Sequence, residues 1–168
     1  TFDFQTNTFQ PVIDTLQRSV PYAILDIPHV WNDWTRNVLS TADDVVITAE
    51  PDLANLRNSK NLYDQLRRLR PNDKPPHLIL NKVGMLKRTE ISPDDFCEPM
   101  DISPIAIIPF DIALFGTAAN SGRMISEIDS KSPVAETFSQ ISHIITGRAV
   151  HRKVQKPGFD LMKLLKRK

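Results

Sequence analysis

The sequence predicts an α/β fold, an open, doubly wound and mostly parallel sheet with helices on both faces. Three observations lead to this prediction. Short runs rich in β-branched residues alternate with helical patterns through the first 146 residues. Each run is continuously apolar, which is typical of strands that are buried on both faces. Polar or charged residues come soon after each run, and ligands of such sheets bind beyond the carboxyl ends of the strands.

The individual elements follow from apolar spacing and from helix caps. Val12, Ile13 and Leu16 lie at helical spacing and predict the first helix. Ser92 is a typical N-terminal cap of a later helix, and Gly147 is a typical stop for the last one. We expect strands at 22–27, 44–49, 77–81 and 105–109, and helices at 8–19, 31–42, 51–71, 92–96 and 132–147.

The composition bounds the class of protein. A chain of 168 residues, 40% of them hydrophobic and 24% charged, fits one soluble globular domain. The single cysteine, Cys97, excludes an internal disulfide and favours a reducing compartment. No leader-like segment precedes the first helix, and no apolar run approaches the roughly 18 residues of a membrane span. We therefore expect a cytoplasmic location.

The stretch YAILDIPHVW, residues 22–31, runs from apolar residues into a carboxylate, Asp26, and then into Pro28. A carboxylate held at a strand end suits Mg²⁺, directly or through water, because magnesium keeps several waters and uses few protein ligands. The same side chain would equally serve to cap the following helix. From Asp26 alone the two interpretations have equal weight.

The usual catalytic motifs are absent from this sequence. It has no G-x-x-x-x-G-K-[ST] motif, whose backbone amides and lysine hold nucleotide phosphates. The stretch GTAANSGR, residues 116–123, predicts a helix-breaking turn. The four histidines, at 29, 77, 143 and 151, lack the spacing of metal ligands. Cys97 lies on a predicted amphipathic helix and is expected to be a packed thiol.

Four stretches carry a resemblance to a known family. They are YAILDIPHVWNDWTRNVLSTADDVVITAEPDLANLRNSKNLYDQLRRLRP, LILNKVGM, IPFDIALFGTAANSGRMISEID and ITGR. Together they resemble the carboxyl-terminal two-thirds of the ATPase-like domain of CpaE/TadZ pilus-assembly proteins, in the ParA/MinD branch of P-loop proteins. The resemblance covers residues 12–148, and the combination of LNKVG with IPFD and FGTAANSG is specific to this subfamily.

The resemblance implies ATP and Mg²⁺ as cofactors of the complete protein. Asp26 matches the family aspartate near Mg²⁺ and the attacking water. Asn81, followed by Lys82, matches the asparagine that reads the adenine edge, since an amide both donates and accepts. On its own, Asn81 also suits a strand-end turn with left-handed φ. The loop that walls the base on the other side is matched by Pro109, Phe110 and Asp111.

Two departures from the family are visible. Active relatives follow the aspartate with Thr-Pro-Pro or a glycine, whereas Ile27, Pro28 and His29 stand here, which weakens the case for γ-phosphate sensing. The amino-terminal strand and the phosphate loop of the family would lie before Thr1. The sheet of this chain is therefore expected to be incomplete, and the chain alone is expected not to hydrolyse ATP.

The carboxyl-terminal segment carries the basic charge. Residues 147–168 have a net charge of +7, against −6 for the rest. We expect an ATPase-like domain over 1–148, a basic linker over 149–158 and an amphipathic basic tail over 159–168. A helix in the tail would present one apolar face flanked by cations, as in helices at membrane interfaces. A flexible tail, or a helix docked on its own domain, has equal weight. The membrane candidates are Phe159, Leu161, Met162, Lys163, Leu164, Leu165, Lys166, Arg167 and Lys168.

Two further features concern partners. The acidic charge outside the tail favours a solvated helix face over DNA binding for the cations of the long helix, which are Arg57, Lys60, Arg67, Arg68 and Arg70. Nucleic acid is therefore not an expected partner. Trp31 and Trp34, three residues apart, are expected to pack their helix against the core.

The resemblance implies a factor that positions and assembles the secretion machinery of Flp (Tad) pilus systems. Such a factor would be a homodimer at the inner membrane or a cell pole, docked on pilus and type II–IV secretion assembly proteins. The alternative is an active, membrane-associated switch ATPase whose phosphate loop lies outside this chain. A DNA-partition ATPase is the third hypothesis.

Overall fold

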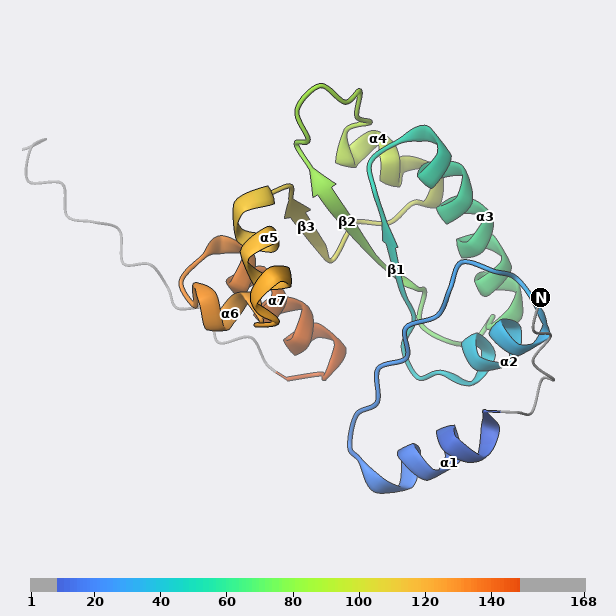
Figure 1. Ribbon diagram of the computed structural model, residues 1–168. Coiled ribbons are helices and arrows are strands. Elements are labelled where there is room, and N and C mark those ends of the chain that lie inside the picture. Colours follow the sequence, from blue (N-terminus) through green and yellow to red (C-terminus); the bar gives the residue numbers. More distant parts are fainter. Residues whose placement is uncertain (1–8, 149–168) are drawn as a thin grey trace, which may run out of the picture.

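The computed structural model describes residues 9–148, in which a three-stranded parallel sheet lies between two groups of helices (Figure 1). In chain order the elements are α1 (Gln10–Ser19), α2 (Asp33–Thr41), β1 (Val46–Ala49), α3 (Leu53–Leu69), β2 (His77–Val83), α4 (Pro93–Cys97), the 3₁₀ helix η1 (Glu98–Met100), β3 (Ala106–Pro109), α5 (Ile112–Ser121), α6 (Ile125–Ile128) and α7 (Pro133–Ile145).

The sheet has the order β1-β2-β3, and both pairs are parallel. Val46 lies opposite His77 in the first pair, and Ile79 lies opposite Ala106 in the second. Parallel neighbours need a crossover connection, which α3 supplies for the first pair and α4 with η1 for the second. The α/β class with a parallel sheet is therefore confirmed.

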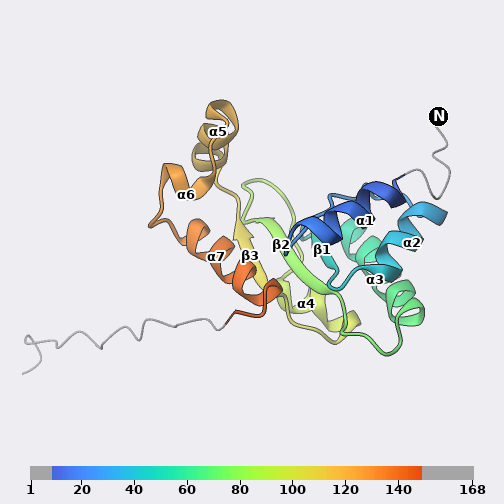
Figure 2. The same cartoon turned by 90° about the horizontal axis from the view of Figure 1, so that it is seen from below.

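Helices cover both faces of the sheet because alternate strand residues point to opposite faces. Figures 1 and 2 show α3 and α4 on one side, and α5, α6 and α7 on the other. The core on the α3 side contains Ile47, Ala49, Tyr63, Leu66, Leu78, Leu80, Phe96, Cys97 and Met100. The core on the α7 side contains Ile79, Ala106, Ile108, Val134 and Ile141. Cys97 is thus the packed thiol that the sequence predicts.

The strand expected at 22–27 is wrong. These residues form no helix or strand, and they carry exposed apolar side chains, with Ile24 91% exposed. A strand persists only where a neighbour takes up its backbone hydrogen bonds, and within the described range β1 pairs with β2 alone. A side-chain hydrogen bond joins the segment to the end of α7: the hydroxyl of Tyr22 donates to the carbonyl of Thr146 at 3.3 Å.

The other three predicted strands are confirmed, as are the five predicted helices, with shifts of one or two residues at most of their ends. Two helices were not predicted, α5 and α6. The expected turn at 116–123 lies mostly inside α5, which ends at Gly122 with a left-handed φ of 63°. Gly116 is tolerated inside this helix, so only the end of that stretch breaks it.

The two tryptophans behave differently. The ring of Trp34 lies 5.7 Å from that of Phe9, so it packs α2 toward the start of α1. Trp31 precedes α2 and is 44% exposed. The expectation that both rings pack against the core is therefore wrong for Trp31.

Candidate functional site

The candidate site lies at the carboxyl edge of the sheet, where the three parallel strands end together. Glu50 and Asp52 follow β1, and Asn81 and Lys82 lie near the end of β2. Phe110 follows β3, and its backbone N–H donates to the carbonyl of Val83 at 2.8 Å. This bond brings the 109–111 segment against the end of β2, so most of the sequence-predicted residues share one edge.

Asp26 stands apart from this group. It is exposed, in the irregular segment before α2, and no hydrogen bond or ion pair joins it to another part of residues 9–148. The alternative role as a cap is not seen either, because the N-terminal cap of α2 is Asn32, whose side chain accepts from Thr35 N–H at 2.8 Å.

The end of β2 has an irregular backbone that positions Asn81. Lys82 has a left-handed φ of 57°, and the pairing with β3 shifts between Leu80 and Val83. Such a bulge re-aims side chains at a sheet edge. The side-chain oxygen of Asn81 accepts the N–H of Lys82 at 2.9 Å, which leaves the two amide hydrogens as its free donors. Asn81 is therefore prepared to donate to an acceptor such as a ring nitrogen.

An ion-pair cluster connects the ends of β1 and β2. The ammonium of Lys82 lies 2.7 Å from Glu50. Arg88, in the loop after β2, contacts the carboxylates of both Glu50 and Asp52. Asp52 also caps α3, because it accepts from Asn55 N–H at 2.8 Å. The cluster thus fixes the beginning of α3 to the loop that follows β2.

The same contacts keep the cluster charged. The hydrogen bond from Lys82, followed by that from Arg88, lowers the pKa of Glu50. The pKa of Asp52 is lowered first by the backbone of Asn55. Glu50 in turn raises the pKa of Arg88. The edge therefore presents fixed charges at neutral pH.

Glu90 holds the loop after β2 in place. Its carboxylate accepts the N–H groups of Gly84 and Met85, both at 2.9 Å. The N–H of Ile91 donates to the carbonyl of Pro51 at 2.8 Å, which ties the end of the loop to β1. Sequence reasoning missed Arg88 and Glu90, because the loop carries no motif and its partners are distant in the chain.

The third strand end combines a cap with exposed apolar groups. Asp111 caps α5, accepting the N–H of Leu114 at 2.9 Å. Phe110 is 37% exposed and Ile112 is 74% exposed. Exposed apolar side chains also follow the other two strands, with Leu53 at 73% and Leu86 at 88%. We call Leu53, Leu86 and Ile112 the apolar rim.

The residues of this edge fit part of a nucleotide better than a metal ion. The amide donors of Asn81 and the exposed ring of Phe110 suit a planar heterocycle, which needs polar contacts at its edge and apolar contacts on its faces. No group of three or more His, Cys, Asp or Glu within 9–148 could hold a metal ion. Mg²⁺ held by one carboxylate and phosphate oxygens would need only Asp26 from this chain.

Two expectations concern residues that are not in the described range. The basic linker at 149–158 and the tail at 159–168 lie outside residues 9–148, so their roles remain predictions. Among the described helices, none is long and apolar enough to cross a membrane.

Comparisons with known proteins agree with the topology. No family model matches the chain. It is 23% identical over 146 residues to the septum site-determining protein MinD of Bacillus subtilis, covering 85% of this chain and 53% of that protein. It is 24% identical over 147 residues to MinD of Thermotoga maritima, covering 86% and 54%. The chain thus spans about half the length of the curated relatives it matches.

Solved structures give the same relationship. The Pyrococcus furiosus cell division ATPase MinD superposes with a TM-score of 0.70 at 18% identity, over 86% of this chain and 60% of that one. A chain of the MinC:MinD cell division protein complex of Aquifex aeolicus gives 0.70 at 19%, over 88% and 61%. A ParA family ATPase from Chlorobium tepidum gives 0.65 at 21%, over 86% and 60%. The chain has the fold of MinD/ParA-like ATPases.

Proposed function

We propose that this chain is part of a ParA/MinD-like nucleotide-binding domain that positions and assembles the secretion machinery of Flp (Tad) pili, as CpaE/TadZ proteins do. The observation that carries the nucleotide part is the hydrogen bond from Phe110 to Val83. It brings an aromatic ring beside the end of β2, where Asn81 has two free amide donors. The pilus part rests on the resemblance of LNKVG and IPFD with FGTAANSG.

In this proposal the adenine ring lies against Phe110 and Pro109, and its edge accepts hydrogen bonds from Asn81. Lys82 stays with Glu50, so the ion-pair cluster shapes the loop instead of contacting the base. Asp26 would hold Mg²⁺ beside the phosphates. ATP with Mg²⁺ and ADP differ in the charge that they place at the site. A nucleotide-driven switch depends on this difference.

A nucleotide titration of the complete protein tests this part. We expect Asn81→Ala to weaken ATP binding about tenfold, the loss of about one hydrogen-bonding group. Asp26→Asn should weaken binding only when Mg²⁺ is present. Asn61→Ala and Asp33→Asn are matched controls, because both residues are exposed and neither belongs to the candidate site. Equal ATP affinity for Asn81→Ala and the unmodified protein would contradict the proposed base contact.

The apolar rim supports a homodimer through the same edge. The three side chains of the rim are each more than 70% exposed and come from segments that follow the three strands, which suits a contact surface at this edge. Sedimentation velocity with ATP should detect a dimer that the double variant Leu53→Asp/Leu86→Asp cannot form. A dimer that this variant forms equally well would place the contact on another surface.

An active, membrane-associated switch ATPase is the second candidate, favoured by the likeness to proteins described as MinD cell division ATPases. In it, a phosphate loop from another part of the protein completes the site, and ATP drives dimerisation and membrane attachment. Steady-state hydrolysis by the complete protein separates the candidates. We expect no turnover from the present chain alone.

Pilus counts in cells carrying Asn81→Ala test the assembly role, since a pure septum-positioning function would leave the pilus counts unchanged.

Partition of DNA is the third candidate and has little support. Of the five cations on or beside α3, Lys60 is paired with Asp64 at 2.5 Å and Arg70 with Asp73 at 2.8 Å. The remaining cations do not form the continuous stripe that phosphate binding requires.

A further inference from the structure

A second surface lies at the opposite end of α3 from the carboxyl edge. It is an open hollow of about 310 Å³ between the segment leading into α2 and the last turns of α3, lined by Trp31, Arg36, Gln65, Arg68 and Leu69. Because α3 begins just after β1 ends and finishes before β2 begins, the hollow lies toward the amino ends of the strands. We call it the α2–α3 notch.

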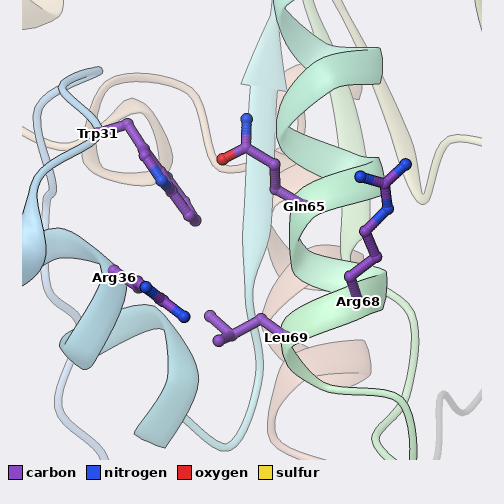
Figure 3. Close-up of a pocket in the computed structure, with 5 residues that line it drawn as sticks. All are labelled: Trp31, Arg36, Gln65, Arg68 and Leu69. Atoms are coloured by element: carbon purple, nitrogen blue, oxygen red, sulfur yellow. The ribbon is translucent and has the colours of Figure 1, made fainter.

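The notch has an apolar half and a polar half. Figure 3 shows the ring of Trp31, the guanidinium of Arg36 and the side chains of Gln65 and Leu69 converging on one space, with the guanidinium of Arg68 turned outward along α3. Trp31 is 44% exposed although it is large and aromatic. Exposed Trp and Arg side chains that meet in a hollow are typical of the anchor points of protein interfaces.

The two arginines of the notch have no side-chain partner in the part of the chain that the structure describes. No carboxylate lines it, and neither Arg36 nor Arg68 makes a side-chain hydrogen bond or ion pair within residues 9–148. Asp33 lies three residues before Arg36 on α2 without pairing with it, while at the end of α3 Asp64 pairs with Lys60 and Asp73 pairs with Arg70. A guanidinium fork without a partner is complementary to a carboxylate.

We propose that the α2–α3 notch binds an acidic peptide segment of a partner protein. A carboxylate of the segment pairs with Arg36, an adjacent apolar or aromatic side chain lies between Trp31 and Leu69, and Gln65 bonds the peptide backbone. Arg68 adds attraction at the outer rim. The notch shares no residue with the carboxyl edge, so its lining can be changed without touching the proposed nucleotide contacts.

The composition of the notch favours a peptide over a nucleic acid. Binding to a phosphate backbone uses many cations along a track, and two arginines in one hollow do not form a track. The apolar surface of Trp31 and Leu69 beside the guanidinium of Arg36 instead suits a peptide with one acidic side chain next to one apolar side chain. The Trp31 ring and Leu69 would gain most from burial of such a neighbour, since both contribute apolar area.

Selection from a random heptapeptide library on the immobilised full chain tests the proposal. We expect selected peptides to be enriched in Asp or Glu next to Leu, Phe or Trp. Binding of those peptides should fall at least tenfold in the double variant Arg36→Glu/Arg68→Glu, because like charges across an interface repel. Trp31→Ala should weaken binding by a similar factor and lower the preference for apolar neighbours. Arg57→Glu/Lys131→Glu is the matched control, with the same charge change at two exposed positions outside the notch.

Three results would overturn the proposal. They are failure to select any peptide, selection without acidic enrichment, and equal binding to the notch variant and the control variant. A 20-base-pair DNA duplex that binds the chain and loses affinity equally in both double variants would identify a diffuse electrostatic surface instead. Thermal unfolding of each variant, monitored by circular dichroism, checks that the fold is retained.

Discussion

Arg70 joins the two helices that form the notch, and its replacement gives the most definite stability prediction. Its side chain is 8% exposed and makes three contacts. One guanidinium nitrogen donates to the carbonyl of Leu39 in α2 at 3.3 Å, and another donates to the carbonyl of Asp43 at 3.2 Å. The third contact is the ion pair with Asp73 at 2.8 Å. The substitution Arg70→Met keeps most of the apolar stem and removes all three.

The expected cost follows from these contacts. Hydrogen bonds from a charged donor contribute about 1.5 kcal/mol each at the low end, and the long distances to Leu39 and Asp43 argue for the low end. The pair with Asp73, whose side chain is 50% exposed, contributes at most about 0.5 kcal/mol after solvent screening. Arg70→Met should therefore lower the free energy of unfolding by about 3 kcal/mol.

Urea denaturation followed by circular dichroism measures this change, and the melting temperature should fall by roughly 6 to 12 °C. Arg67→Met is the matched control, because Arg67 is exposed on the same helix without a side-chain partner, and its effect should stay within about 0.5 kcal/mol. Arg70→Lys should recover only part of the loss, since one ammonium cannot reach both carbonyls. A loss of less than about 0.5 kcal/mol for Arg70→Met would refute the view that Arg70 holds α2 against α3.

Three further predictions follow from the site and the core. Arg88→Ala should lower the free energy of unfolding at neutral pH and lose that effect in acid, because Glu50 and Asp52 have lowered pKa values in the fold. The stability that these two carboxylates contribute is present above the ordinary carboxylate pKa and is lost as the pH falls through the lowered values. Urea titrations at several pH values measure it. Asp111→Ala should cost about 1 kcal/mol by removing the cap of α5, whereas Asp111→Asn should cost much less, and equal losses in thermal melts would contradict the capping role. Phe96→Ala, at a fully buried position, should cost about 3 to 5 kcal/mol in the same assay, and a loss below 1 kcal/mol would mean that the α3-side core collapses around the cavity.

The parts of the fold that could be predicted are those fixed by local chemistry. Ser92 and Ser132 each accept a backbone N–H three residues on, at 3.2 and 3.1 Å, so the caps that their sequences suggest do form. The strand at 77–83 was recognisable because both of its faces are buried, which produces a continuous apolar run. Such features depend on residues a few positions apart.

The failed strand at 22–27 has the same local pattern but a different long-range environment. An apolar run predicts burial, yet burial and strand pairing depend on what lies beside the segment, which the run does not specify. In the described fold Ile24 has no covering element and no strand beside it. The apolar run therefore does not by itself determine whether residues 22–27 pair with a strand.

For the candidate site, too, the sequence reached what adjacent residues determine and missed the contacts between distant ones. Asn81 lies near the end of β2 and Asp111 follows β3, and a parallel sheet brings strand ends together whatever the loops contain. Arg88 could not be found, because it lies 36 and 38 positions from the carboxylates that it contacts. Asp111 caps α5, which a short-range pattern could have suggested, and its expected place in the wall of a ligand site stays a prediction.

Helix α3 connects the two surfaces described above, and the same pair of residue types holds each end. Asp52 caps its first turn and contacts Arg88 at the carboxyl edge, while Arg70 follows its last turn and contacts Asp73 beside the notch. A 17-residue α-helix is about 25 Å long and nearly rigid, so if a ligand at one surface shifted α3, the shift would reach the other surface. Binding at the two surfaces would then be coupled, and by linkage the effect of each ligand on the affinity of the other would be equal. Because Arg88 and Arg70 fix the two ends independently, loss of either contact should weaken that coupling without removing either binding surface.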